Sequence, residues 1–264
     1  MRRRNFLPSL LLTSAAARSI VASVPEDIKK AGREYYELRR YHLRRGPKIK
    51  LFNDFLRNTA LPVMKRNGIG PVGVFDVMIG PDSPSLYILI PYKSLEDFAT
   101  ASDRVAATDE YQKAEFISLP ATDPGYVRAE SQLMVAFQGM PKLEVPPAHS
   151  EGPPRIFELR TYESHNSKAG KKKIEMFNNG EIKIFRRAGF HPVFFGETLI
   201  GSKLPNLTYM LAFDNMAAHD KAWDAFRIDP EWKKLSSTPG YTDAEIVSNI
   251  SNMFLRPAPY SEIR

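Results

Sequence analysis

The sequence predicts an α+β fold made of two tandem ferredoxin-like domains, each with the element order βαββαβ. Three observations predict it. The 264-residue chain matches itself when it is shifted by 121 residues, each copy reads as strands and helices in the same order, and a proline-rich stretch separates the copies. The domains are expected at residues 34–138 and 155–256, which is an ordinary domain length.

The internal match keeps one register from the first strand of each copy to its second helix. Residues 35–41 (YYELRRY) align with residues 156–162 (IFELRTY). Later matches at the same shift are Gly68 with Gly189, Pro71 with Pro192, Asp103 with Asp224, Tyr111 with Trp232 and Lys113 with Lys234. A local slip of four residues is expected in the first helix, where Phe52-Asn53 aligns with Phe177-Asn178. The shared register indicates duplication of one unit.

Each copy begins with a strand of alternating side chains, expected at Tyr35–His42 in the first copy, and continues into an amphipathic helix. Glycine follows both first helices, at Gly68 and Gly189, and suits the left-handed position that ends a helix. Pro62 is expected to kink the first of these helices, and Asn179-Gly180 to interrupt the second. The other expected elements are strands at 71–79, 85–92 and 126–137 with a helix at 94–116, and strands at 192–200, 206–213 and 246–256 with a helix at 215–236.

A βαββαβ unit places both helices on one face of an antiparallel sheet, so the other face of the sheet needs a partner. Two such sheets packed face to face form a barrel. Because both copies lie in one chain, we expect an intramolecular pseudo-dimer. Residues 139–154 contain five prolines and are expected to form an extended linker between the copies.

The first 23 residues predict an export signal. Three arginines at positions 2–4 precede the uncharged residues 5–17, a stretch too short to span a bilayer, and small residues follow. The sequence RRNFL at residues 3–7 resembles a bacterial twin-arginine signal, so the expected location is the bacterial periplasm. An ordinary secretory signal, or a basic tail without export, is the alternative.

Composition narrows the function classes. Hydrophobic residues make up 43% of the chain and charged residues 25%, which is typical of a soluble globular protein, and no later segment is apolar enough to cross a membrane. Residues 1–23 hold four of the 37 basic residues and none of the 30 acidic ones, so the remainder has only a mild basic excess. Without a groove-reading motif, nucleic-acid binding is not expected. The lack of cysteine excludes disulfides, thiolate catalysis and iron–sulfur clusters.

Both first strands contain the pattern Glu-x-Arg-x-Tyr, whose members share one strand face because side chains alternate. The six candidate ligand-binding residues are Glu37, Arg39, Tyr41, Glu158, Arg160 and Tyr162. The alternate, mainly apolar positions suit a helix-covered core, so these six are expected to face the barrel interior. They form either two structural Glu–Arg pairs or the polar floor of a ligand cavity, where arginine would fix an anionic or carbonyl group.

No catalytic residue is identified from the sequence. The five histidines have neither metal-ligand spacing nor an accompanying carboxylate cluster, so no metal site is expected. Nucleophile-elbow and phosphate-binding glycine motifs are absent, and no cofactor is expected. Trp223, Phe226 and Trp232 have helical spacing and are expected to be core residues.

The first-strand motif, the Gly68-x-x-Pro71 turn and the run at residues 109–113 (DEYQK) resemble NIPSNAP-type domains in both copies. The resemblance implies the dimeric α/β-barrel fold, which NIPSNAP-type domains share with small monooxygenases and stress-response barrel proteins. It implies no settled catalytic mechanism. Related barrels bind haem through a single histidine, which leaves haem as an alternative to a cofactor-free barrel.

These observations together predict an exported NIPSNAP-like protein that binds a small molecule or serves as an interaction module, with a protein partner or a homo-oligomer as alternatives. The competing expectation is an enzyme of the monooxygenase- or isomerase-like barrel type that uses Tyr41, Arg39, Tyr162 or Arg160. The copies differ, for example in Arg40 against Thr161, so any site is expected to be asymmetric.

Overall fold

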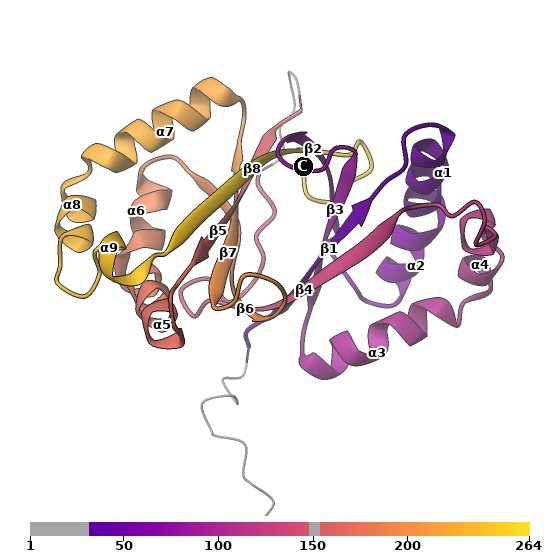
Figure 1. Ribbon diagram of the computed structural model, residues 1–264, viewed down its shortest axis with the longest axis horizontal. Helices are drawn as coiled ribbons and strands as arrows, with labels where there is room; N and C mark the ends of the chain where they lie inside the picture. The colour runs from indigo at the N-terminus through magenta and orange to yellow at the C-terminus, as the bar shows by residue number, and fades with distance from the viewer. Residues whose placement is uncertain (1–31, 148–153) are drawn as a thin grey trace, which may run out of the picture. The chain divides into compact units, whose positions relative to one another are not determined.

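The structure is a computed structural model that describes residues 32–147 and 154–264. The export signal expected at residues 1–23 and residues 148–153 of the expected linker lie outside the described residues. The described residues form one closed eight-stranded barrel with helices outside both halves (Figure 1).

The first copy contributes four strands and its helices in the predicted order. Its strands are β1 (Tyr35–His42), β2 (Gly73–Ile79), β3 (Ser85–Tyr92) and β4 (Arg128–Ala136). Its helical segments are α1 (Pro47–Phe55), the π-helical turn η2 (Leu56–Ala60), α2 (Leu61–Arg66), α3 (Leu95–Ala106), α4 (Asp109–Gln112) and the 3-10 turn η3 (Glu115–Ser118). Gly68 after α2 has φ 72°, the left-handed conformation predicted for it.

The second copy repeats this order. Its strands are β5 (Ile156–Glu163), β6 (His191–Ile200), β7 (Asn206–Phe213) and β8 (Asn249–Pro257). Its helical segments are α5 (Ser167–Met176), the π-helical turn η4 (Phe177–Glu181), α6 (Ile182–Arg187), α7 (Met216–Ile228), α8 (Pro230–Ser236) and α9 (Asp243–Ile246). Gly189 after α6 has φ 93°, again as predicted.

The strand order around the barrel is β1-β3-β2-β8-β5-β7-β6-β4, with antiparallel pairing throughout. The last strand of each copy joins the other copy, since β8 pairs with β2 and β4 pairs with β6. Closure leaves no free strand edge in the barrel. The predicted fold class, two ferredoxin-like units forming an intramolecular barrel, is confirmed.

The first helices keep the 121-residue offset, so the expected slip of four residues is wrong. The π-helical turns η2 and η4 begin at Leu56 and Phe177, and the helices after them begin at Leu61 and Ile182. The structural counterpart of Phe52 is therefore Lys173. The sequence match was misleading because Phe52 and Phe177 stand at positions one helical turn apart. Both positions face the core between helices and sheet.

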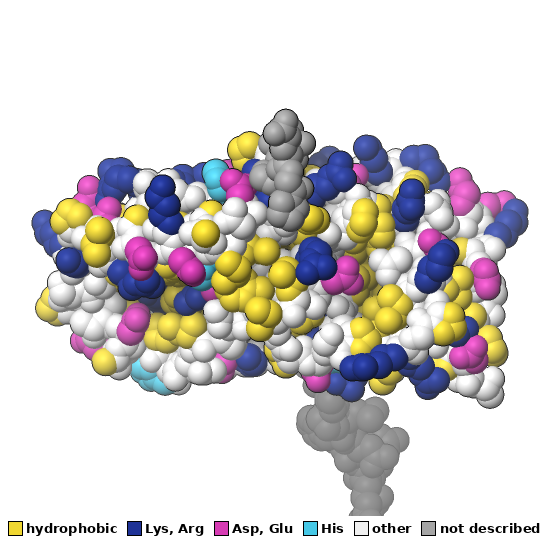
Figure 2. Space-filling view, turned by 90° about the horizontal axis from the view of Figure 1, so that it is seen from above, with side chains coloured by type: hydrophobic (Ala, Val, Ile, Leu, Met, Phe, Trp, Pro, Cys, Tyr) yellow, Lys and Arg dark blue, Asp and Glu magenta, His cyan; other side chains and the backbone are white. Residues whose placement is uncertain are grey.

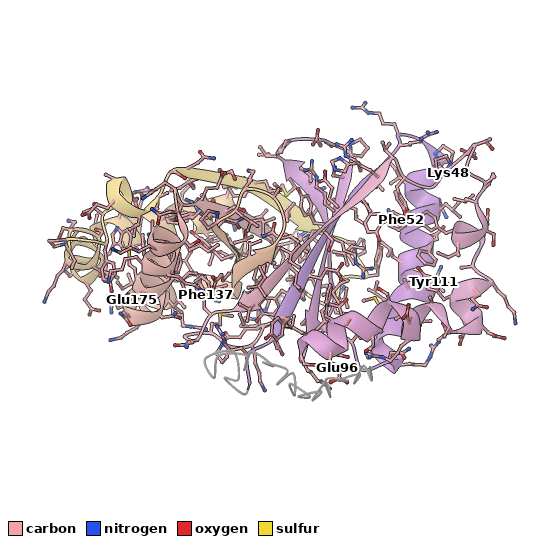
Figure 3. The ribbon with its side chains drawn as sticks, turned by 60° about the horizontal axis from the view of Figure 1, so that its bottom comes forward. Lys48, Phe52, Glu96, Tyr111, Phe137 and Glu175 are labelled. Carbon is pink, nitrogen blue, oxygen red and sulfur yellow. The ribbon has the colours of Figure 1, made fainter. Side chains whose placement is uncertain are left out.

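Three large apolar cores and a small fourth cluster around Met176 stabilise the described residues. The barrel interior is filled by side chains that are almost completely buried, chiefly Tyr36, Leu38, Phe75, Phe157, Leu159 and Phe194. A core lies between sheet and helices in each half. Phe137, which follows β4 of the first copy, packs in the second half, 5.7 Å from the ring of Phe177, and Figure 3 shows it there. Among the described residues, no helix has the length and apolarity needed to cross a membrane.

The expectation that the Glu-x-Arg-x-Tyr side chains face the barrel interior is wrong. Tyr36 and Leu38 belong to the barrel core, so Glu37, Arg39 and Tyr41 point to the opposite face of β1, under the helices. The physical reason is that both faces of this sheet are buried. The middle of the closed interior is packed with apolar side chains and its polar side chains gather at one mouth, whereas the helix side contains cavities in which charges can keep hydrogen-bond partners.

Candidate functional site

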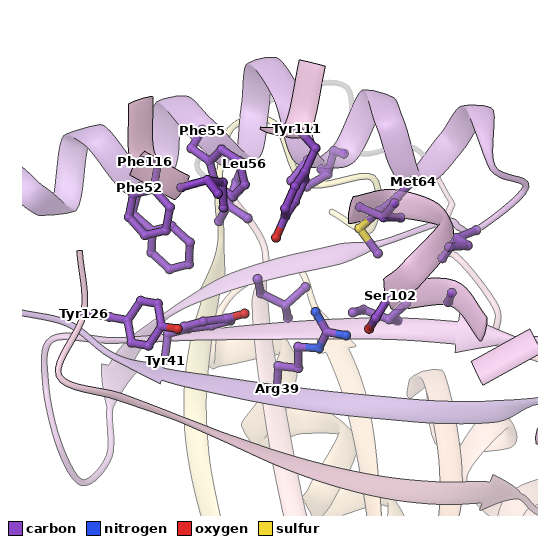
Figure 4. Close-up of a pocket in the computed structure, with 18 of the residues that line it drawn as sticks. Arg39, Tyr41, Phe52, Phe55, Leu56, Met64, Ser102, Tyr111, Phe116 and Tyr126 are labelled. Carbon is purple, nitrogen blue, oxygen red and sulfur yellow. The ribbon is translucent and has the colours of Figure 1, made fainter. Parts of the chain in front are cut away.

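A cavity of about 150 Å³ lies between the sheet and the helices of the first copy. Aromatic and aliphatic side chains from α1, η2, α2, α3 and β3 form most of its wall, and Arg39 and Tyr41 of β1 form its floor (Figure 4). Its aromatic members are Tyr41, Phe52, Phe55, Tyr92, Tyr111, Phe116 and Tyr126. Phe52 and Tyr111 lie on the helix side of the sheet in Figure 3 as well.

Glu37 fixes Arg39 at this floor. The carboxylate of Glu37, 4% exposed, accepts hydrogen bonds from Arg39 Nε at 2.6 Å, Ser131 Oγ at 2.7 Å and Tyr92 OH at 2.9 Å. Burial raises the pKa of Glu37, but these hydrogen bonds and the charge of Arg39 outweigh burial and leave the pKa below its ordinary value. The carboxylate is thus ionised at neutral pH, and both of its oxygens accept hydrogen bonds from side chains of the protein.

The guanidinium of Arg39 lines the cavity beside the hydroxyl of Tyr41. Among the described residues, its hydrogen bond to a carboxylate is made by Nε, and none runs from Nη1 or Nη2 to a carboxylate. Figure 4 shows the guanidinium rising from the sheet toward Tyr111 and Ser102. A planar pair of N–H donors with a neutralised charge in an apolar cavity suits a carboxylate or carbonyl oxygen.

The second copy uses the same triplet differently. Arg160 Nη1 donates to Glu158 Oε1 at 2.6 Å and Nη2 donates to the hydroxyl of Tyr162 at 3.2 Å, while Nε is buried without a hydrogen-bond partner among the described residues. Glu158, fully buried, also accepts from Trp223 Nε1 and Asn252 Nδ2. The terminal nitrogens of Arg160 are therefore occupied, and the two halves are asymmetric as expected.

A buried ion pair replaces apolar residues in the second copy. Lys173 and Glu181 are each 1% exposed, with Nζ 3.4 Å from Oε2, and they stand at the positions of Phe52 and Ala60. Burial raises the pKa of Glu181, and Lys173 lowers it only in part. For Lys173, burial favours the neutral amine, but Glu181, Tyr162 and Asp243 together raise its pKa above the ordinary value.

The sequence reasoning did not single out Lys173, Glu181 or His219, which all line a cleft with Arg160. The signal was available: an unbroken shift of 121 residues aligns Lys173 with a phenylalanine and Glu181 with an alanine. The barrel's own open space is a separate pocket of about 640 Å³ at one mouth, where Arg40, Tyr87, Gln132 and Thr161 lie. Within residues 32–147 and 154–264, no group of three or more side chains is arranged to hold a metal ion.

Comparison with solved structures gives similar folds. A candidate monooxygenase from Fusobacterium nucleatum is 9% identical, with a TM-score of 0.57 over 86% of this chain and 93% of that one. A candidate monooxygenase from Lactobacillus acidophilus is also 9% identical, with a TM-score of 0.54 over 85% and 94%. A NIPSNAP family protein from Agrobacterium tumefaciens is 19% identical over 44% of this chain and its own full length, with a TM-score of 0.39.

Comparison with curated proteins found no match. The family comparison is decisive, because the NIPSNAP model matches residues 36–137 and again residues 157–262, which is most of the chain. Both matches span a complete strand–helix unit of the barrel. The chain belongs to the NIPSNAP family, with two tandem NIPSNAP domains closed into one barrel.

Proposed function

We propose that this protein binds a small molecule in the cavity of its first copy, with a carboxylate or carbonyl group of the ligand on Arg39. One observation carries the proposal: Arg39 presents terminal N–H donors without a carboxylate partner to a cavity whose walls are otherwise mostly apolar. A donor pair in such surroundings gains more from an acceptor than it would in water.

The size of the cavity restricts the ligand. An engineered apolar cavity of about 150 Å³ binds benzene, and the cavity above Arg39 has the same volume. The aromatic side chains around it, including Phe52, Tyr111 and Phe116, offer edges and faces to a single ring. A one-ring acid or ketone fits both the walls and the floor, so benzoate is a suitable probe.

Arg39→Met is expected to weaken benzoate binding by about 10- to 100-fold, because it removes charged hydrogen bonds of about 1.5–3 kcal/mol. Arg160→Met is the matched control, since it also leaves a buried glutamate without its arginine but lies in the other half. Titration calorimetry gives the affinities. Arg39→Lys, which keeps the charge and loses the planar donor pair, should lie between the wild type and Arg39→Met. Equal losses in Arg39→Met and Arg160→Met would refute the proposal.

An enzyme of the dimeric α/β-barrel type is the second candidate, since two proteins of similar fold are named as candidate monooxygenases. Binding and turnover are separated by mass spectrometry of a ligand that co-purifies with the protein. Recovery of that ligand unchanged after incubation in air supports binding alone, and a product with added oxygen supports the enzyme.

We also propose export through the twin-arginine route, supported by the sequence RRNFL near the N-terminus. A reporter fused behind residues 1–31 is expected to reach the periplasm of a bacterial host, and the double change Arg3→Lys with Arg4→Lys should retain it in the cytoplasm. Cell fractionation provides the measurement. Unchanged export of the double variant would point to an ordinary secretory signal.

A further inference from the structure

The second copy contains a cleft with a different chemistry from the first cavity. The cleft has a volume of about 750 Å³ and lies between α7 and β8, with Glu158, Arg160 and Tyr162 of β5 at its floor. Lys173, Glu181 and Trp232 also line it. In Figure 2, dark blue and magenta side chains lie together around a hollow in the half that contains α7.

The lining of this cleft has an excess of negative charge. Its carboxylates are Glu158, Glu181, Asp220, Asp224 and Asp243, whereas its full cations are Arg160, Lys173 and Arg227. His219, 2.8 Å from Asp220 and 3.4 Å from Glu158, leaves the excess in place even when it is protonated. The lining of the first cavity, by contrast, includes no carboxylate among the described residues.

The cations of the cleft are already engaged. Arg160 is hydrogen-bonded to Glu158, Arg227 is paired with Asp224, and Lys173 lies 3.4 Å from Glu181 and 3.5 Å from Asp243. Glu181 is 1% exposed, and its Oε2 is held by the ion pair with Lys173 Nζ at 3.4 Å but by no hydrogen bond of ordinary geometry among the described residues. A buried carboxylate oxygen at the wall of the cleft whose one ion-pair contact is this long can still accept a hydrogen bond from an incoming N–H group.

Cationic side chains of the protein already lie against the aromatic rings of the cleft. The guanidinium of Arg160 lies 4.6 Å from the ring centroid of Trp223, and the ammonium of Lys173 lies 5.3 Å from that of Tyr162 and 5.7 Å from that of Trp232. Aromatic faces next to carboxylates are the surroundings that stabilise organic ammonium groups. Phe254 adds a further ring to the wall.

We propose that this cleft is a second binding site, specific for a small organic cation such as an arylalkyl ammonium. The ammonium group is attracted by the carboxylates of Asp220, Asp243 and Glu181, and its apolar part lies against the aromatic wall. One chain then holds two sites of opposite preference, an acid or ketone in the first copy and an amine in the second. The substitution of Phe52 and Ala60 by Lys173 and Glu181 accompanies this difference.

The chain has only two tryptophans, Trp223 and Trp232, and both line this cleft. Tryptophan fluorescence therefore reports on this site selectively. Benzylammonium is expected to change the fluorescence in a saturable titration, whereas benzyl alcohol, its uncharged analogue, and benzoate should give a response at least about tenfold weaker. Equal responses to benzylammonium and benzyl alcohol would overturn the proposal.

Two exposed carboxylates can be substituted to test the site without disturbing the fold. Asp220 and Asp243 have side chains 70% and 62% exposed, and the double variant Asp220→Asn with Asp243→Asn should weaken benzylammonium binding by about tenfold. The control, Asp54→Asn with Asp109→Asn, removes the same charge from helices of the first copy and should leave the affinity unchanged. If both double variants weakened benzylammonium binding equally, the attraction would come from the general surface charge, and a specific site would be refuted.

The proposal for this cleft and the proposal for the first cavity can be refuted independently of each other. Arg39→Met should leave the benzylammonium titration unchanged while it weakens benzoate. Loss of both ligands in that variant would show that the two probes share one site, and would refute the amine site in the second copy.

Discussion

Replacing Lys173 by methionine is expected to lower the free energy of unfolding by about 3–5 kcal/mol at neutral pH, as for other buried ion pairs that lose one partner. The change leaves Glu181, 1% exposed, with no cation at its 3.4 Å contact. Methionine fills nearly the same volume as lysine, so the loss reports charge rather than packing. Chemical denaturation followed by circular dichroism measures it.

The loss should become smaller in acid. Burial already raises the pKa of Glu181 in the intact pair, and removal of Lys173 raises it further. A carboxyl group whose pKa is raised in the folded state stabilises the fold below its unfolded value, near 4.5, and this contribution is lost as the pH rises through the folded value. The difference between wild type and Lys173→Met should therefore shrink as the pH falls toward 4.5.

The first copy supplies the control for this prediction. The double variant Lys173→Phe with Glu181→Ala installs the residues that stand at the same positions in the first copy, Phe52 and Ala60. Replacement of a buried pair by apolar residues is often neutral or stabilising, so we expect the double variant to regain most of the stability. A double variant as unstable as Lys173→Met would show that the pair's neighbours, not the unpaired charge, cause the loss.

Replacing Phe157 by alanine is expected to cost about 3–5 kcal/mol of stability, because the closed barrel cannot collapse around the cavity. Phe157 is fully buried in the barrel interior, with its ring centroid 4.9 Å from that of Phe75 of the first copy. Since β8 and β4 each join the other copy, the variant should still unfold in a single transition. Denaturation followed by both fluorescence and circular dichroism tests both statements.

Phe157→Leu is the matched control, since it keeps most of the buried apolar volume and should cost less than half as much as Phe157→Ala. Two separated transitions in Phe157→Ala, with tryptophan fluorescence changing apart from circular dichroism, would contradict a barrel that folds as one unit. The tryptophans report only on the second copy, so the comparison is sensitive to independent unfolding of that half.

Much of the fold could be predicted because the duplication shows each strand and helix pattern twice in the sequence. The strand β1 was predicted with its observed bounds, Tyr35–His42, and the glycines after the first helices of both copies were assigned the conformation that they adopt. The π-helical turns η2 and η4 were not predicted. Pro62 comes directly after η2, which interrupts the first helix, and Asn179-Gly180, which was expected to interrupt the second, lies within η4.

The candidate residues of each first strand share one face as predicted, but that face was assigned to the wrong side of the sheet. Alternation in β1 shows that Glu37, Arg39 and Tyr41 share a face, but periodicity carries no information on which face closes into the barrel. In a sheet with one solvated face, polarity would decide the orientation. Here both faces are covered, so that rule fails.

The sequence by itself determined the repeat, the order of the elements, the pairing of the two sheets and the asymmetry of the copies, because these depend on local patterns and on burial of an uncovered face. Only the tertiary structure decided that no terminal nitrogen of Arg39 meets a carboxylate among the described residues, whereas Arg160 Nη1 donates to Glu158 and Nη2 donates to Tyr162. That difference depends on which side chains from distant helices and strands surround each arginine, and no spacing within one strand can encode it.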